Sequence, residues 1–134
     1  MTYMLDTNIC IYAMKNHPPQ VEARIKEHID SGLCISAITL AELEHGVQKS
    51  QRVAKNMEAL LKFLTILEVL PFDDSAAVEY GKIQAHLQEK GTPIGTADAL
   101  IAGHARAEGL TLVTNNLREF ARVPGLQVEN WAEG

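Results

Sequence analysis

Three carboxyl side chains and one amide in this sequence could form a single acidic site. Asp6 directly follows a short apolar run, Glu42 lies among apolar neighbours, and Asp98 precedes a further apolar run that ends before Asn116. Carboxylates that gather in one crevice repel one another unless a cation joins them, and their hard oxygen atoms select Mg²⁺ or Mn²⁺. Such ions activate water and stabilise charge on a phosphate, so this set favours metal-assisted phosphodiester hydrolysis.

Each of these residues also has an ordinary structural interpretation, and spacing alone leaves both interpretations open. Asp6 could be a turn residue and helix cap, and Asp98 could complement the positive end of a helix dipole. A helical glutamate such as Glu42 is commonly a solvated surface residue, and Asn116 stands in a segment typical of loops. The spacing is therefore compatible with a metal site but does not establish one.

The elements that would position these side chains follow from alternating apolar runs and helical repeats. Such alternation predicts a three-layer α/β/α fold with a mostly parallel central sheet, in which ligands bind beyond the carboxyl ends of the strands. The predicted strands are residues 3–5, 33–35, 66–70, 110–113 and 126–128. The predicted helices are residues 7–14, a segment from Val21 to near Gly32, 37–47, 53–64, a segment ended by Gly91, 96–108 and 118–121.

Helix starts and buried faces are predicted from the same patterns. Ser36 is the expected N-cap of the helix that carries Glu42, and Asp74 or Ser75 is expected to cap the helix ended by glycine. Thr96 is the expected cap of the helix that carries Asp98. The apolar side expected on the 53–64 helix comprises Val53, Met57, Leu60, Leu61 and Leu64, and that on the helix ended by Gly91 comprises Val78, Ile83 and Leu87.

Composition places the chain among ordinary globular proteins. Its 134 residues are 46% hydrophobic, which predicts one domain over residues 1–134 with a core that needs no disulfides. The formal net charge of −5 argues against a protein that coats nucleic acid, but not against a metal site acting on phosphate. No apolar run is long enough for a membrane helix, and no signal peptide is recognised, so a cytoplasmic protein is expected.

Four segments, taken in order, resemble the successive motifs of PIN-domain toxins of the VapC family. They are MLDTN at residues 4–8, the segment 35–46 around Glu42, the segment 93–105 that begins PIG, and the segment 112–126 that begins LVTNN. Each motif alone is weak, but four in register cover essentially the whole chain. The resemblance implies a PIN fold of the α/β/α type and Mg²⁺-dependent endoribonuclease activity, with Mn²⁺ able to substitute.

The resemblance also assigns roles to individual residues. Asp6, Glu42 and Asp98 match the acidic positions of the family, with Asp6 and Asp98 as direct metal ligands and Glu42 binding metal or orienting water. Many relatives carry Asp at the fourth acidic position, where this chain has Asn116, and Glu119 is close enough to substitute. Hydroxyl groups beside the acids are expected to hold carboxylates or water in place. These hydroxyl groups belong to Thr7 and Thr114.

Partners are implied by the family in the same way. The resemblance implies a homodimer and a VapB-type antitoxin, whose basic side chain could occupy the acidic pocket while an apolar helix packs nearby. It implies a structured RNA substrate, with the anticodon stem-loop of a tRNA as first candidate, and contact with DNA only through the antitoxin. The basic residues expected to contact the RNA backbone are Lys15, Lys49, Arg52, Arg106 and Arg118.

Competing hypotheses place different demands on the sequence. A non-catalytic PIN-like module that binds RNA or protein is disfavoured by the three intact carboxylates. A flavodoxin-like phosphoacceptor domain needs an acceptor Asp in mid-chain and a Lys after a late strand, and neither is present. A haloacid-dehalogenase-type phosphatase needs a second Asp two residues after Asp6, where this chain has Asn8. His104 is expected to be a structural or surface residue rather than a catalytic one.

Overall fold

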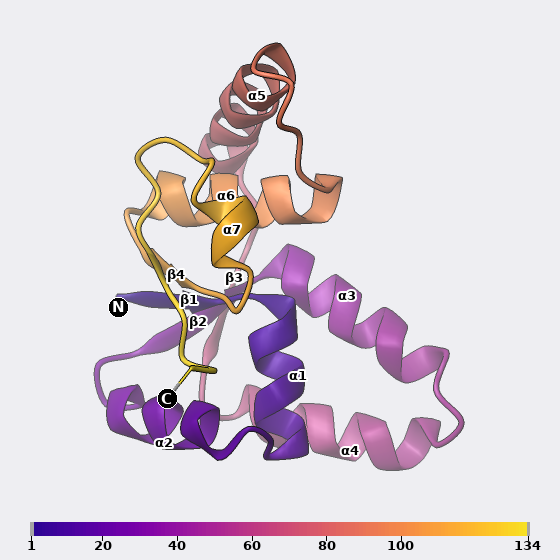
Figure 1. The fold of residues 1–134 in the computed structure, drawn as a ribbon. Coiled ribbons are helices and arrows are strands. Elements are labelled where there is room, and N and C mark those ends of the chain that lie inside the picture. The colour runs from indigo at the N-terminus through magenta and orange to yellow at the C-terminus, as the bar shows by residue number, and fades with distance from the viewer. Residues whose placement is uncertain (1, 134) are drawn as a thin grey trace.

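Seven helices surround a five-stranded sheet in residues 2–133, the part of the chain that the computed structural model describes (Figure 1). The two ends of the predicted domain, residues 1 and 134, lie outside it. The strands are β1 (Tyr3–Leu5), β2 (Leu33–Ser36), β3 (Glu68–Leu70), β4 (Thr111–Val113) and β5 (Val128–Glu129). The helices are α1 (Thr7–Lys15), α2 (Pro19–His28), α3 (Ala37–Gln48), α4 (Val53–Leu64), α5 (Asp74–Glu89), α6 (Thr96–Glu108) and α7 (Leu117–Phe120). None of the described helices combines the length and apolar character needed to cross a lipid bilayer.

All five strands run parallel, in the order β3-β2-β1-β4-β5. The central strand β1 is paired on both sides, with Tyr3 opposite Leu33 of β2 and Thr111 of β4. The chain moves outward from β1 to β3 and then returns to the other side of β1 as β4. The strand order therefore reverses between β1 and β4, and side chains beyond their carboxyl ends enter a ready-made crevice.

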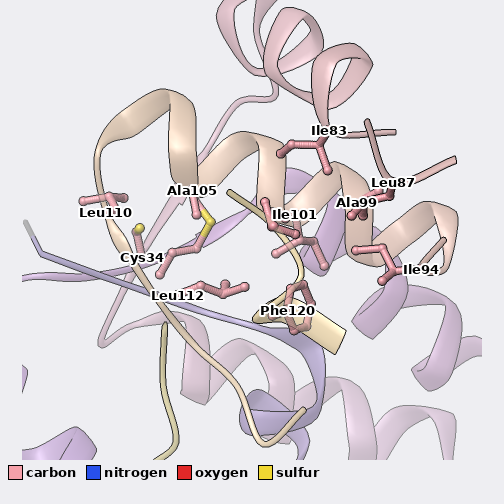
Figure 2. Packing of buried hydrophobic residues seen from close by; sticks show 13 residues of the cluster. Cys34, Ile83, Leu87, Ile94, Ala99, Ile101, Ala105, Leu110, Leu112 and Phe120 are labelled. Atoms are coloured by element: carbon pink, nitrogen blue, oxygen red, sulfur yellow. The ribbon is translucent and has the colours of Figure 1, made fainter. Parts of the chain in front are cut away.

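Two separate cores cover the two faces of the sheet, which confirms the three-layer prediction. Successive strand residues point to opposite faces, so Met4 and Leu112 pack beneath α5, α6 and α7, whereas Leu5 and Val113 pack against α1 to α4. Figure 1 shows these two helical layers on opposite sides of the sheet. Figure 2 shows the first core, where the labelled residues include Ile83, Leu87, Ala99, Ile101 and Phe120.

β3 and β5 begin two residues later than predicted because turns extend into their apolar runs, and β2 and β4 each differ from prediction by one residue at one end. Residues 66 and 67 were expected to begin a strand, but their amides donate to Phe63 and Leu64, so the backbone is still turning at the end of α4. The last strand begins at Val128 rather than 126, because Gly125 has a φ of 73° in the preceding turn. Pattern alone does not separate an apolar turn from a strand.

Helix α5 corrects two further predictions. Asp73, rather than Asp74 or Ser75, is the N-cap, and its carboxylate accepts a hydrogen bond from the Ala76 amide. Val78 was expected on the buried side, yet it is 57% exposed, because it stands five residues before Ile83 and falls off the buried face. The buried positions of α5 are Ala76, Ile83 and Leu87.

Helices α4 and α6 depart from prediction in smaller ways. Val53 and Leu61 were expected on the buried side of α4, but both are exposed, and Phe63 is buried with Leu60 instead. The N-cap of α6 is Gly95 rather than Thr96, and no side chain caps this helix. Gly95 therefore leaves the first turn of α6, which carries Asp98, without a side-chain acceptor for its amides.

The C-terminal segment packs against the start of β1 and against α2 through an aromatic cluster. Trp131 is fully buried; its ring stacks on His28 at 4.9 Å between centroids and meets Tyr3 edge-on at 5.1 Å. The guanidinium of Arg24 lies 5.3 Å from the centre of the same indole. The Trp131 indole N–H donates to Glu129 at 3.1 Å. The last described residues are thus fastened to the first strand and to α2.

Helices α5 and α6 cross at a glycine. A Cβ atom added to Gly103 of α6 would lie 2.7 Å from the backbone nitrogen of Tyr80 on α5. The obstructing atoms are backbone, which cannot rotate away as the end of a side chain would. Only glycine lets the two helices approach this closely.

We therefore expect Gly103→Ala to destabilise the protein by about 1–3 kcal/mol, the usual cost of overpacking a core. Gly81→Ala on α5 is the matched control, because a Cβ there would have nothing within 4 Å. Helix propensity alone should make that control about 0.5–1 kcal/mol more stable. Urea unfolding of both variants measures the difference, and equal stabilisation of both would show that the crossing does not need glycine.

Candidate acidic active site

Asp6 is a buried carboxylate at the carboxyl end of the central strand. It caps α1, where its Oδ1 accepts a hydrogen bond from the Ile9 amide at 2.9 Å, and it is only 4% exposed. Burial raises the pKa of the Asp6 carboxyl to about 6, against the lowering effect of hydrogen bonds from Thr114 and Ile9. The charges of Asp98 and Glu42 raise this pKa further. Asp6 is therefore both the N-cap of α1 and a candidate residue of the acidic site.

Thr114 links the end of β4 to this carboxylate. It follows Val113, whose carbonyl accepts the Asp6 amide at 2.9 Å, so β1 and β4 remain paired up to the site. The Thr114 hydroxyl hydrogen-bonds to the Asp6 carboxylate and accepts the Asn116 amide at 2.9 Å. Thr114 thus stands where the sequence placed it, beside the acid, and it also orients the loop that carries Asn116.

Thr7 holds the second carboxylate. Its hydroxyl donates to Glu42 Oε1 at 2.6 Å, and the Thr7 hydroxyl oxygen also lies 3.4 Å from the hydroxyl of Thr39. Thr39 is fully buried on α3, one turn before Glu42. The sequence analysis did not single out Thr39; its one signal was a hydroxyl three residues before a candidate acid on the same helix. The three residues join the start of α1 to α3.

Asp98 stands half-buried in the first turn of α6. Burial raises the pKa of its carboxyl, and the charge of Glu119 on α7 raises it more than the charge of Glu42 does. Since Asp98 and Glu42 also raise the pKa of Asp6, three acids from α1, α3 and α6 share one electrostatic neighbourhood. Glu119 adds a fourth charge on the Asp98 side.

The carboxylates in this neighbourhood suit a hard divalent cation for two reasons. Their oxygen atoms are the ligands that such ions prefer, and their negative charges repel one another without an ion between them. Among residues 2–133, however, no three acidic, histidine or cysteine side chains are gathered tightly enough to hold an ion jointly. Mg²⁺ commonly keeps several waters and takes only one or two protein carboxylates. A site with Asp6 at its centre meets that requirement, while Glu42 remains held by Thr7.

An apolar groove of about 270 Å³ reaches one of these acids, Glu42. It lies between α1, α3 and α4, and Glu42 forms part of its wall together with the polar side chains of Lys15 and Asn56. The remaining lining residues are Ile11, Met14, Leu43, Gly46, Val47 and Ala59. The acidic cluster therefore has an apolar surface immediately beside it.

The basic residues proposed to contact RNA are not equivalent. Arg106 is not available, because its guanidinium bonds Glu79 at 2.8 Å and the Pro124 carbonyl at 2.9 Å and so ties α6 to α5 and to the C-terminal loop. The other four basic residues are exposed. They are Lys15, Lys49, Arg52 and Arg118.

Comparison with known proteins places these features in a family context. The PIN domain family matches residues 3–126, a range that contains all four candidate acidic-site positions. The chain is 47% identical over 131 residues to the tRNA(fMet)-specific endonuclease VapC of Salmonella typhimurium, with 98% of each chain covered. It superposes with a TM-score of 0.93 and 45% identity on a structure of VapBC2 from Rickettsia felis bound to a promoter DNA fragment, covering 98% of this chain and 99% of that one. A DNA-bound VapBC structure from Salmonella typhimurium also gives 0.93, at 47% identity and 98% coverage of both chains.

The raised pKa of Asp6 predicts opposite pH trends with and without a divalent cation. Without metal, the folded protein binds this proton more tightly than the unfolded chain does, so stability should fall as pH rises from about 4 to about 6. A metal competes with the same proton, so the rise in Tm caused by Mg²⁺ should grow through about pH 6. Thermal unfolding from pH 4 to 8 measures both trends, and Asp6→Asn should flatten them. The prediction would be contradicted if Tm depended on pH and on Mg²⁺ in the same way in the parent and in Asp6→Asn.

Proposed function

The chain belongs to the PIN-domain family and, within it, to the VapC ribonucleases, and from that membership we propose that it is the toxin of a type II toxin–antitoxin pair that cleaves tRNA. The relative from Salmonella typhimurium is named for its action on tRNA(fMet), and 47% identity over nearly the full length supports the same substrate class here. We propose the anticodon stem-loop as the place of the cut. The observation that carries the proposal is the buried Asp6 carboxylate, which lies at the point where the strand order reverses and has two further acids beside it.

We propose that Asp6 and Asp98 bind Mg²⁺, for which Mn²⁺ can substitute, and that Glu42 binds the ion or orients the attacking water. A bound ion would supply an activated water and neutralise charge at the scissile phosphate. Glu119 is the better candidate for the fourth acid, because its charge already acts on Asp98. Asn116 contributes to the site through its backbone amide, which donates to the Thr114 hydroxyl and so holds Thr114 in place.

The chain's own hydroxyl groups set the geometry of these acids. Thr7 donates to Glu42 and so leaves the second oxygen of that carboxylate available for an ion or a water. Thr114 and the Ile9 amide occupy donor positions around Asp6, which limits the directions from which an ion can approach it. Positioning by such neighbours determines both the affinity for metal and the rate of reaction.

Ligand substitution tests this assignment. Asp6→Ala and Asp98→Asn should each lower Mg²⁺-dependent RNA cleavage by about two orders of magnitude or more, because the ion supplies both nucleophile and charge stabilisation. Glu108→Gln is the matched control, since Glu108 is an exposed acid at the far end of the same α6.

Purified protein with Mg²⁺, Mn²⁺ or EDTA gives the rates, and expression in cells followed by RNA sequencing identifies the cut RNA. Full activity in EDTA, or in the Asp98→Asn variant, would refute the metal site. Broad cleavage of messenger RNA with intact tRNA would refute the substrate but leave the metal site standing.

A VapB-type antitoxin is the proposed partner. The two solved relatives named above are VapBC complexes bound to DNA, and we propose that this chain likewise meets DNA only through its antitoxin. The groove between α1, α3 and α4 suits an apolar helix, and the adjoining acids suit an Arg or Lys from the same partner. The homodimer expected from the family stays a prediction, as does action in the cytoplasm, where the tRNA substrate is found.

Filling the groove should separate partner binding from catalysis. Ala59→Phe places a ring in the groove from α4, away from the acids, and should weaken antitoxin binding by about tenfold or more. Ala54→Phe is the control, because Ala54 is exposed on the same helix and does not line the groove.

Calorimetric titration with the VapB-type antitoxin measures affinity, and RNA cleavage by free toxin should be equal in both variants. Undisturbed affinity in Ala59→Phe would place the antitoxin elsewhere.

A further inference from the structure

A buried histidine outside the acidic cluster connects α3, which carries Glu42, with α6, which carries Asp98. His104 of α6 is fully buried, and its Nδ1 lies 2.8 Å from the hydroxyl of Ser36, 68 residues away in sequence. We propose that His104 is a positioning residue of the active site, which fixes α3 and its Glu42 relative to α6 and its Asp98. This inference rests on the proposed function, because it concerns the same metal site.

Ser36 is the residue through which this contact can influence the position of Glu42, because it caps the helix that carries Glu42. Its residue ends β2 and caps α3, and its hydroxyl accepts the Ile38 amide at 3.1 Å. The same oxygen therefore holds both the first turn of α3 and the imidazole. Thr39 and Glu42 follow within the next two turns, so a change in the direction in which α3 leaves Ser36 would move the Glu42 carboxylate.

His104, at the other end of this contact, is held in place by packing around α6. His104 follows Gly103, where the α5 backbone approaches α6 so closely that a Cβ would meet it at 2.7 Å. The ring of Phe72 meets the imidazole edge-on at 5.4 Å between centroids. Helix α6 is thus pressed from one side by α5 and joined on the other to Ser36, which limits how far Asp98 can move along the helix axis.

The polar nature of residue 104 needs a reason beyond filling space. Burial lowers the pKa of His104, so the imidazole is neutral, and in residues 2–133 its Nε2 has no hydrogen-bond partner. A buried polar atom without a partner is unfavourable, and an apolar side chain would fill the same volume without that penalty. The one bond that His104 makes, to Ser36, is what an apolar residue could not supply.

Two amide substitutions distinguish this bond from packing. The amide of His104→Asn stands near the position of Nδ1 and can keep the bond to Ser36, whereas the amide of His104→Gln stands near Nε2 and cannot. We expect Mn²⁺ affinity to stay within about twofold of the parent in the Asn variant and to fall about tenfold in the Gln variant, which is the lower end of the range for residues behind metal ligands. In the Gln variant kcat should fall while KM for RNA is unchanged.

Ile101→Val provides the packing control. Ile101 is fully buried on the same helix and makes apolar contacts only, so this variant should melt at a lower temperature yet bind Mn²⁺ as the parent does. Calorimetric titration of each purified protein with MnCl₂, alongside thermal unfolding, separates the two effects. Equal Mn²⁺ affinity in the Asn and Gln variants, or a similar loss in Ile101→Val, would overturn the inference.

A second variant covers the case in which the Gln protein does not fold. Ser36→Gly removes the hydroxyl, and glycine is tolerated at helix N-caps better than alanine. It should also weaken Mn²⁺ binding about tenfold, and unchanged affinity would overturn the inference. If the parent itself bound no Mn²⁺, the proposed function would fail, whereas normal binding by the parent and by all His104 and Ser36 variants would remove only the positioning role.

Discussion

The structure depends on one buried carboxylate. Asp6 must leave water when β1 enters the centre of the sheet, and its charge is tolerated there only because fixed donors surround it. One donor is the Ile9 amide at the start of α1, and another is the Thr114 hydroxyl at the end of β4. The requirement to satisfy this carboxylate therefore also fixes the relative placement of a helix and a strand from opposite ends of the chain.

The strand order converts that local requirement into a site. With β1 between β2 and β4, helices that follow β1 and β2 begin at the same edge of the sheet, and α6 reaches it from the other layer. The charges of Glu42 and Asp98 consequently raise the pKa of Asp6, and the charge of Glu42 raises the pKa of Asp98, although the three acids belong to no common segment. A cation bound among these acids would relieve the repulsion between their charges.

Sequence patterns predicted what depends on local order. The alternation of strands and helices gave the layers, and the position of Asp6 after a strand gave the edge at which the site lies. The patterns could not give contacts that depend on how distant elements approach one another. The bond from His104 to Ser36 and the ion pair between Arg106 and Glu79 are of this kind. The exposure of Val78 was missed for a different reason, since a five-residue offset was taken as part of a helical face.

The aromatic cluster at the C-terminus has a consequence for the order of events during synthesis. Strand β1 leaves the ribosome well before its partner β4 and before the indole of Trp131 that covers Tyr3. Contacts of such long sequence separation form late, because most of the chain must be ordered before they close. A nascent chain that still lacks these residues has neither Thr114 beside Asp6 nor a completed sheet. The acidic cluster is therefore complete only after the segment through Trp131 has been made, and a shorter nascent chain lacks the finished site.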